Sequence, residues 1–379
     1  MSDMEKYSIG IGDRFGKEGK AQLMAVMEIN RIGIPVTPIW NKSNREHLLT
    51  GTTPESVRKE ADEVVSELGW KAPYYVDADH VNLNSVDAFI PFSDFFTLDV
   101  AEAIHPGSEQ FEGTYGDALA MAAQLNDHIR KQRTDSILME ISMDEVDRPQ
   151  TPDELYRILK GLTTQGFLPN TVAPRFTGKF PKGVDYIGNV DLFEFEFERD
   201  LEVIRRSVTE LGYPAGLKLS LHSGSDKFSL YPVIRRLLKK HGAGIHVKTA
   251  GTTWLEEVIG LARSGREGLS LAKEIYSRGF RRFEEMTAPY SSVLQIDPRK
   301  LPDPAEVITW NSSRFRETLT HDAGCSLYNA DFRQLVHVSY KVAAELGNEF
   351  LDALDYYRTP VEEQVYHNLL EKHLKPLFG

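Results

Sequence analysis

Residues 136–176, SILMEISMDEVDRPQTPDELYRILKGLTTQGFLPNTVAPRF, decide the fold class. The stretch opens with a short apolar run, SILMEIS. An amphipathic segment follows, TPDELYRILKGLTTQG, which starts on a Thr-Pro cap and closes on glycine. A second apolar run, TVAPRF, comes next. Strand, helix and strand in this order are typical of a βαβ unit, in which the two strands lie parallel in one sheet.

The same alternation extends through residues 7–265. It contains eight apolar runs: YSIGIG from Tyr7, IPVTPIW from Ile34, YYVDAD from Tyr74, FFTLDVA from Phe95, SILMEIS from Ser136, TVAPRF from Thr171, LKLSLHS from Leu217 and GIHVKTAG from Gly244. Eight strands, each followed by a helix, predict an α/β fold of the (β/α)8 TIM-barrel type, with a doubly wound open sheet as the alternative. One segment, DLFEFEFER at 191–199, reads either as an exposed strand or as a helix.

After about residue 265 the strand pattern stops and helical stretches follow. We therefore expect two domains: a barrel catalytic domain over residues 1–265 and a helical extension over residues 266–379, packed on the barrel. The extension has three candidate roles. It covers the barrel, completes the mouth of the active site or forms a subunit contact in a homo-oligomer.

The composition limits the partners of the protein. The chain has 379 residues, of which 44 are basic and 56 acidic, and its net charge is −12. This charge repels nucleic acid and anionic membranes, so we expect a small-molecule partner. The single cysteine, Cys325, fits a reducing compartment. The sequence shows neither a signal peptide nor a membrane-spanning run, which favours a cytoplasmic protein.

Polar side chains stand at the predicted strand ends, where a barrel of this type carries its active site. These residues are Asp13, Asp79, His80, Asp99, Glu140, Arg175, His222, His246 and Lys248. The alternation of strand side chains puts three sets on common faces. The sets are Asp77 with Asp79, His246 with Lys248, and Lys218 with Ser220 and His222. Ionisable groups gathered inside a barrel are costly to bury unless they are paired or bind a cation.

The histidines predict a metal site. His80, His222 and His246 fall at strand ends with carboxylates nearby, and we expect them to be metal ligands, with Glu140 or Asp79 as additional ligands. Imidazole nitrogens suit Zn²⁺, Mn²⁺, Co²⁺ or Ni²⁺ better than Ca²⁺ or Mg²⁺. His80 has the opposite strand parity from Asp79, but it occupies the end of its strand, where the chain turns.

Three groups of residues are candidates for binding a substrate. Small hydroxyls and charges crowd the stretch after the seventh strand and suit a polyol, although a βα turn uses the same residue types; they are Ser223, Ser225, Asp226 and Lys227. Lys248 is an electrostatic clamp, a Schiff-base nucleophile or a barrel salt bridge. Arg175 and Lys179 either meet a substrate carboxylate or lie in a solvated loop.

The sequence contains no recognised motif for binding another cofactor. GIGDRFG after the first strand resembles a dinucleotide loop, but Phe15 occupies the third required glycine position, so we do not infer NAD. The sequence also lacks a P-loop, a GxSxG elbow, HExxH and paired CxxC motifs. Cys325 lies beyond the barrel, where a free cysteine is usually packed.

Five motifs resemble the tagaturonate epimerase family: YVDADH, LDVAE, VAPRFTGKFPKGVDYIG, LKLSLHSGSDKFSLYP and HVKTAGT. The similarity runs from roughly residue 70 to residue 260. The family includes members that interconvert tagatose and fructose. The resemblance implies a metal-dependent sugar epimerase on a TIM barrel, with Asp79 as the proton acceptor. It also places His80, His222 and His246 on the metal. We add Glu140 as the proton donor.

Three functions follow as hypotheses. The first is an epimerase that interconverts tagaturonate and fructuronate, or tagatose and fructose, by inversion at the carbon β to the ketone. Because simple enolisation does not acidify that carbon, the route is either reversible C–C bond cleavage or direct proton transfer. The second is a metal-dependent sugar aldolase of the class II type. The third is a non-catalytic sugar-binding or chaperone subunit.

Overall fold

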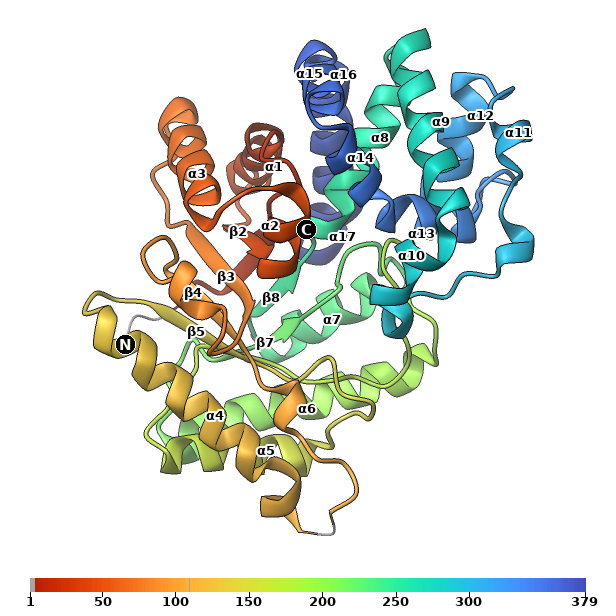
Figure 1. The fold of residues 1–379 in the computed structure, drawn as a ribbon. Coiled ribbons are helices and arrows are strands. Elements are labelled where there is room, and N and C mark those ends of the chain that lie inside the picture. The colour runs from red at the N-terminus through yellow and green to blue at the C-terminus, as the bar shows by residue number, and fades with distance from the viewer. Residues whose placement is uncertain (1–3, 109) are drawn as a thin grey trace.

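The computed structural model describes residues 4–108 and 110–379, and these form a closed barrel of eight parallel strands in sequence order (Figure 1). The strands are β1 Tyr7–Ile11, β2 Thr37–Ser43, β3 Tyr75–Val81, β4 Phe95–Asp99, β5 Leu138–Ser142, β6 Thr171–Ala173, β7 Lys218–Leu221 and β8 Ile245–Lys248. Each predicted apolar run overlaps one of them, and β2 and β3 extend beyond their runs by three and two residues. Because β8 pairs with β1, the sheet closes, which confirms the (β/α)8 barrel and excludes the open sheet.

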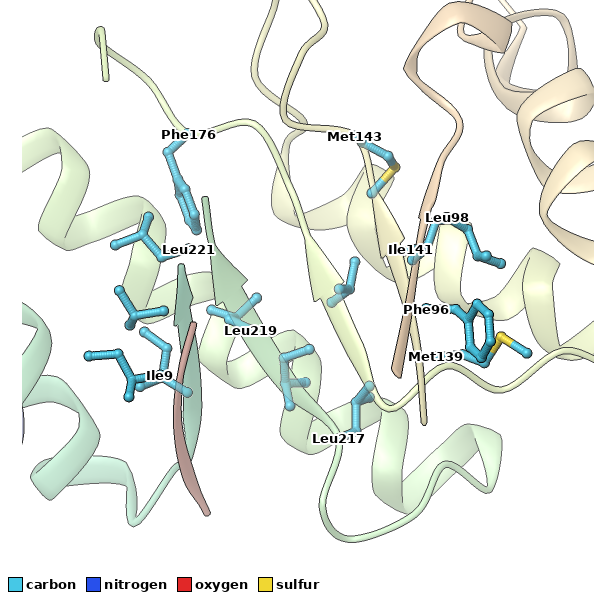
Figure 2. Close-up of a cluster of buried hydrophobic side chains, with 14 of the residues drawn as sticks. Ile9, Phe96, Leu98, Met139, Ile141, Met143, Phe176, Leu217, Leu219 and Leu221 are labelled. Carbon is cyan, nitrogen blue, oxygen red and sulfur yellow. The ribbon is translucent and has the colours of Figure 1, made fainter. Parts of the chain in front are cut away.

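The two faces of the strands differ in chemistry. Outward side chains such as Ile9, Phe96 and Leu219 belong to the main hydrophobic core between strands and helices (Figure 2). A small apolar cluster inside the barrel joins Ile39, Phe95 and Leu138 with Met4. Above this cluster the barrel interior is polar, and its polar side chains lead up to the carboxyl ends of the strands.

The helices that surround the barrel are α1 Gly19–Arg31, α2 Asn44–Thr50, α3 Pro54–Leu68, α4 Phe111–Gln132, α5 Pro152–Thr164, α6 Val190–Leu211 and α7 Tyr231–His241. Thr53 and Thr151 cap α3 and α5 through capping boxes, each followed by proline. The ambiguous segment 191–199 is helical. Phe193 and Phe197 lie four residues apart on the buried face of α6, so the helical period prevails over the alternation.

The C-terminal third is helical, as expected. Its helices are α8 Thr253–Arg263, α9 Arg266–Arg281, α10 Phe283–Thr287, α11 Pro304–Val307, α12 Ser312–Leu319, α13 Ala330–Val338, α14 Tyr340–Leu346, α15 Asn348–Tyr356, α16 Arg358–His367, the π-helix Asn368–Leu374 and α17 Lys375–Phe378. α8 packs against α9, α12 and α16 and belongs to a second hydrophobic core beside the barrel.

The end of the chain returns to the barrel. The π-helix packs against α1, and α17 packs against α7, so these two segments fill the helical layer between α7 and α1 (Figure 1). Leu374 and Leu377 are buried in the main barrel core. The division at residue 265 stays a prediction, and the structure adds that the last residues of the chain support the barrel itself. In the part of the chain that is described, no helix combines the length and apolar character needed to cross a bilayer.

Candidate functional site

A cavity of about 300 Å³ opens at the carboxyl ends of the strands, where barrel active sites lie. Its walls come from the loops after the strands and from the C-terminal helical region. The barrel side contributes Asp79, His80, Asp144, Arg175, His222, Ser223, Ser225 and Lys248, while Ser292, Val293 and His337 belong to the C-terminal region. The helical extension therefore helps to form the mouth of the cavity, one of its three expected roles.

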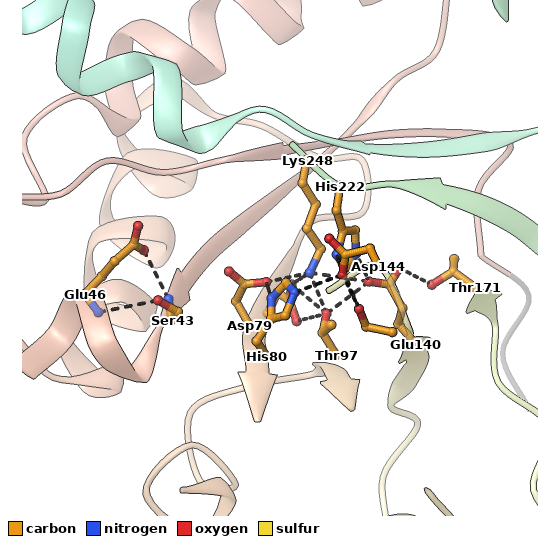
Figure 3. A network of polar contacts seen from close by, with 12 residues as sticks. Ser43, Glu46, Asp79, His80, Thr97, Glu140, Asp144, Thr171, His222 and Lys248 are labelled. Atoms are coloured by element: carbon orange, nitrogen blue, oxygen red, sulfur yellow. Dashed lines mark hydrogen bonds and ion pairs between the residues drawn. The ribbon is translucent and has the colours of Figure 1, made fainter. Parts of the chain in front are cut away.

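Two imidazoles and one carboxylate meet in this cavity. Nδ1 of His222 lies 2.9 Å from Oδ1 of Asp144, and Nε2 of His80 lies 3.4 Å from the same oxygen. One donor atom from each of the three residues lies within 4.8 Å of the other two, and they form the one such group in the described ranges that is able to hold a metal ion. Figure 3 shows the three side chains converging from β3, the loop after β5 and the end of β7.

An irregular backbone brings His80 to this group. The pairing of β3 with β4 shifts register between Ala78 and Val81, and His80 has a φ of 54°. A left-handed non-glycine residue costs of order 1–2 kcal/mol, and such strain gathers at functional sites. The bulge turns the His80 ring to the same side as Asp79, which overrides the strand parity. Ser223 and Asp226, on the loop after β7, are the other non-glycine residues with positive φ in the described chain.

Carboxylates hold the second nitrogen of each ring. Nδ1 of His80 donates to Oδ1 of Asp79 at 2.8 Å, and Nε2 of His222 donates to Oε1 of Glu140 at 2.6 Å. A carboxylate behind a histidine fixes the orientation of the ring and makes it a better metal ligand. Asp79 and Glu140, predicted as acid–base residues, both stand in this position. Asp79 also lines the cavity, whereas Glu140 is fully buried below it and binds Thr171 with its other oxygen at 2.6 Å.

Lys248 connects the carboxylates beneath the two rings. Its ammonium lies 2.6 Å from Asp79, 2.9 Å from Asp77 and 3.4 Å from Glu140. Burial alone would lower the pKa of Lys248, but these three carboxylates raise it. A Schiff-base nucleophile needs a lowered pKa, so the geometry favours the clamp and salt-bridge interpretations over the nucleophile.

The ionisation states follow from these contacts. Burial would raise the pKa of Asp79 and of Glu140, yet Lys248 and the adjacent imidazole hold both pKa values well below the usual range. Burial would lower the pKa values of His80 and His222, but carboxylates raise both. The site thus keeps its carboxylates ionised and concentrates negative charge around the two rings.

This donor set fits a divalent transition metal ion. Two imidazole nitrogens and a carboxylate oxygen are the ligands that Zn²⁺, Mn²⁺, Co²⁺ and Ni²⁺ accept. All three residues line the cavity, so a ligand that enters the cavity would be able to reach an ion held there. Asp79 and Glu140 already orient the two rings, so the residues of this site fit a divalent metal ion.

The structure does not bring His246 into this group. His246 pairs in register with Ser220, two residues below His222, so its ring lies about 7 Å deeper in the barrel at ~3.3 Å per residue. Its Nδ1 lies 3.1 Å from Oγ of Ser8, and its ring centroid lies 5.6 Å from that of Phe95. Burial lowers the pKa of His246 to about 3, which keeps the ring neutral.

The residues after β7 separate into two pairs. Ser223 and Ser225 line the cavity. Asp226 faces the C-terminal helices instead, where it lies 3.2 Å from Arg333 and accepts a 2.7 Å hydrogen bond from Thr252. Lys227 donates to the carbonyls of residues 181, 184 and 225 at 2.7–3.0 Å. These contacts give Asp226 and Lys227 a role in holding the loop rather than in touching a ligand.

The two candidates for a substrate carboxylate also separate. Arg175 lines the cavity, and its Nη1 donates to the carbonyl of Asp144 at 3.2 Å. Lys179 is exposed outside the cavity and donates to Oε1 of Gln295 at 3.0 Å.

Sequence reasoning missed several residues that form the cavity. Asp144 lies two residues beyond β5, and its place just past a strand end was a usable signal. Arg14, Lys182 and His337 also line the cavity. No local signal marks Lys182 or His337, because a loop and a distant helix reach the cavity only through tertiary packing.

The closed barrel and its cavity of ionised and hydroxyl side chains define a (β/α)8-barrel enzyme with a candidate metal centre at the carboxyl ends of its strands. The model of one family, described as tagaturonate epimerase, matches residues 1–114 and 108–377. The chain belongs to the tagaturonate epimerase family, and it is an isomerase of the epimerase type.

Relatives agree with this assignment. The tagaturonate/fructuronate epimerase of Thermotoga maritima is 28% identical over 416 residues, which cover 98% of this chain and 79% of the relative. The native crystal structure of fructuronate-tagaturonate epimerase from Cohnella laeviribosi is 25% identical with a TM-score of 0.82, covering 100% of this chain and 82% of that one. The same enzyme complexed with two glycerol molecules, at 23% identity and a TM-score of 0.86 over the same shares, matches in fold.

Proposed function

We propose that this chain interconverts tagaturonate and fructuronate with a divalent metal ion held by His80, Asp144 and His222. The single observation that carries the proposal is the convergence of these three side chains inside the cavity of about 300 Å³ at the strand ends. Membership of the tagaturonate epimerase family supplies the substrate class. Zn²⁺, Mn²⁺, Co²⁺ and Ni²⁺ all suit the two nitrogens and one oxygen.

The chemistry requires more than proton transfer next to a ketone, because the inverted carbon is β to it. A divalent ion held at the three ligands would polarise the ketone oxygen and stabilise charge that develops there. In this proposal, Asp79 exchanges a proton with the substrate. Its Oδ1 is engaged by His80 and Lys248, while Oδ2 has no hydrogen-bond partner in the described residues, and the side chain lines the cavity.

We propose reversible C–C cleavage as the route. Asp79 Oδ2 accepts the proton of the hydroxyl on the inverted carbon, the C–C bond to the α-carbon breaks, and its electron pair passes into the enolate of the ketone. The new aldehyde rotates and the enolate adds to its other face. Asp79 then returns the proton to the hydroxyl oxygen, so that atoms and charges balance over the cycle.

Other residues position these groups. Glu140 acts through the ring of His222 rather than on the sugar, because it lies beneath the cavity with both oxygens engaged. Lys248 keeps Asp79 and Glu140 ionised. Ser223 and Ser225 line the cavity, and in this proposal they bind sugar hydroxyls.

The test is a product assay. The protein, supplied in turn with Mn²⁺, Ni²⁺, Co²⁺ or Zn²⁺, is incubated with tagaturonate, and we expect fructuronate to form until equilibrium is reached. No turnover with any of these ions would refute the proposal. The same reaction in D₂O decides the route: bond cleavage leaves the inverted carbon free of deuterium, whereas direct proton transfer labels it.

A further inference from the structure

One cation in the cavity has no partner. Lys182, on the loop between β6 and α6, lines the cavity, and its ammonium forms no hydrogen bond or ion pair with any residue in the ranges 4–108 and 110–379. Its backbone N–H donates to the carbonyl of Val293 at 3.0 Å, which anchors the residue between the barrel and the C-terminal region. The Lys182 side chain is half-buried, and a cation partly removed from water without a partner is costly.

The surroundings of Lys182 are rich in positive charge. Burial, and after it the nearby Arg14 and Arg45, lower the pKa of Lys182 to about 8, while Glu145 and Asp144 act in the opposite direction. Lys182 is therefore mostly protonated at neutral pH. An anion at this point would compensate the charges that repel one another.

The neighbouring cation, Arg14, already has an ion-pair partner. Arg14 forms an ion pair with Glu46, and its guanidinium lies 4.1 Å from the ring centroid of Tyr340. His337, which lies beside the same loop at Gly183, is held neutral because burial and then Arg14 and Lys182 keep its pKa well below the usual value. Among these three cavity-lining residues, Lys182 alone has a charge free to meet a ligand.

We propose that Lys182 binds the carboxylate of a uronate substrate and thereby selects sugar acids over neutral ketohexoses. The inference rests on the proposed function and adds the residue that recognises the acid group. Arg14 contributes positive potential without leaving Glu46. An ion held by His80, Asp144 and His222 would bind the ketone side of the sugar, and Lys182 receives the charged end. A neutral ketohexose carries a hydroxymethyl group there and gains no charge partner.

The test compares Lys182→Met with Lys160→Met, a control in which the lost ammonium is exposed on α5, away from the cavity. For tagaturonate, Lys182→Met should lower kcat/KM by about 10- to 100-fold, the loss expected for one hydrogen bond between charged groups. For tagatose, the change should stay within about threefold. Lys160→Met should change neither. Circular dichroism and bound metal should match wild type in both variants.

A binding measurement separates failure of this inference from failure of the proposed function. Isothermal titration with D-galactonate and with galactitol requires no turnover. Galactonate should bind wild type and Lys160→Met more tightly than galactitol does, and Lys182→Met should lose that preference. If Lys182→Met keeps the preference, or if Arg175→Met abolishes it instead, the inference is overturned. If wild type binds galactonate through Lys182 but does not turn over tagaturonate, only the proposed function fails.

Discussion

Replacing Asp144 by asparagine tests the proposed metal site most sharply. Asp144 supplies the one carboxylate of the group, and its Oδ1 lies 2.9 Å from His222 and 3.4 Å from His80. Asparagine keeps the shape and loses the negative charge, so the variant retains its fold and two of three protein ligands. If three ligands share an apparent binding free energy of order 10–16 kcal/mol, one of them accounts for about 3–5 kcal/mol.

This loss corresponds to a drop in metal affinity of about 10²- to 10⁴-fold. The affinity is measured by competition between the protein and a chelating dye for Zn²⁺, with metal content checked after dialysis. Asp147→Asn is the matched control, because Asp147 lines the same cavity but does not belong to the group of three. Equal Zn²⁺ affinity in wild type and Asp144→Asn would refute the assignment of ligands.

Three further predictions concern the groups around the site and the fold. Glu140→Gln removes the negative charge behind His222 but keeps a hydrogen-bond acceptor there. This variant should bind Zn²⁺ about 10- to 100-fold more weakly in the same dye competition. Unchanged Zn²⁺ affinity would contradict the role of Glu140 in orienting the His222 ring. Leu374→Ala should lower the free energy of unfolding in urea by about 2–5 kcal/mol, because Leu374 is fully buried in the barrel core. A loss below about 1 kcal/mol would show that the end of the chain contributes little to the stability of the barrel. Lys218 lies inside the barrel, and burial lowers its pKa to about 7. Between pH 7 and about 10 the unfolded state therefore binds more protons at this residue than the folded state does. The free energy of unfolding rises with pH in this range, by at most ~1.4 kcal/mol per pH unit. Urea unfolding of Lys218→Met at pH 7.5 and 9 should show a smaller rise than wild type, and an equal rise would contradict the lowered pKa.

Local patterns were sufficient to predict the barrel. Each strand carries its own apolar run, and alternation placed Asp77 with Asp79 and His246 with Lys248 on common faces. The ion pairs of Lys248 with both aspartates agree with this placement. So does the contact of His246 with Phe95, a member of the apolar cluster inside the barrel. Helical period also decided the alternating segment of α6, since two of its phenylalanines lie on one buried side.

The depth of a side chain within the barrel was harder to predict than its face. His222 follows the end of β7, whereas His246 lies two residues before the end of β8. Two residues of strand are enough to move a ring from the cavity into the barrel interior. The orientation of the His80 ring depends on an irregularity in the pairing of β3 with β4, which the local sequence does not predict.

Loop and tertiary contributions could not be predicted from the sequence. Asp144 belongs to an irregular loop, so neither helical nor strand periodicity indicates where its carboxylate lies. Lys182 and His337 meet only because the C-terminal helices pack over the loop after β6. The polar residues of SGSDK were all equally suited to bind a sugar when judged from the sequence. In the structure Ser223 and Ser225 line the cavity, whereas Asp226 pairs with Arg333.

The most direct test is anomalous diffraction from a crystal of the protein grown with Zn²⁺ or Mn²⁺. The account predicts one strong peak about 2.0–2.2 Å from Nε2 of His80, Nδ1 of His222 and an oxygen of Asp144. A peak beside His246 with none at these three residues, or no peak in the cavity at a Zn²⁺ concentration that supports turnover, would contradict it.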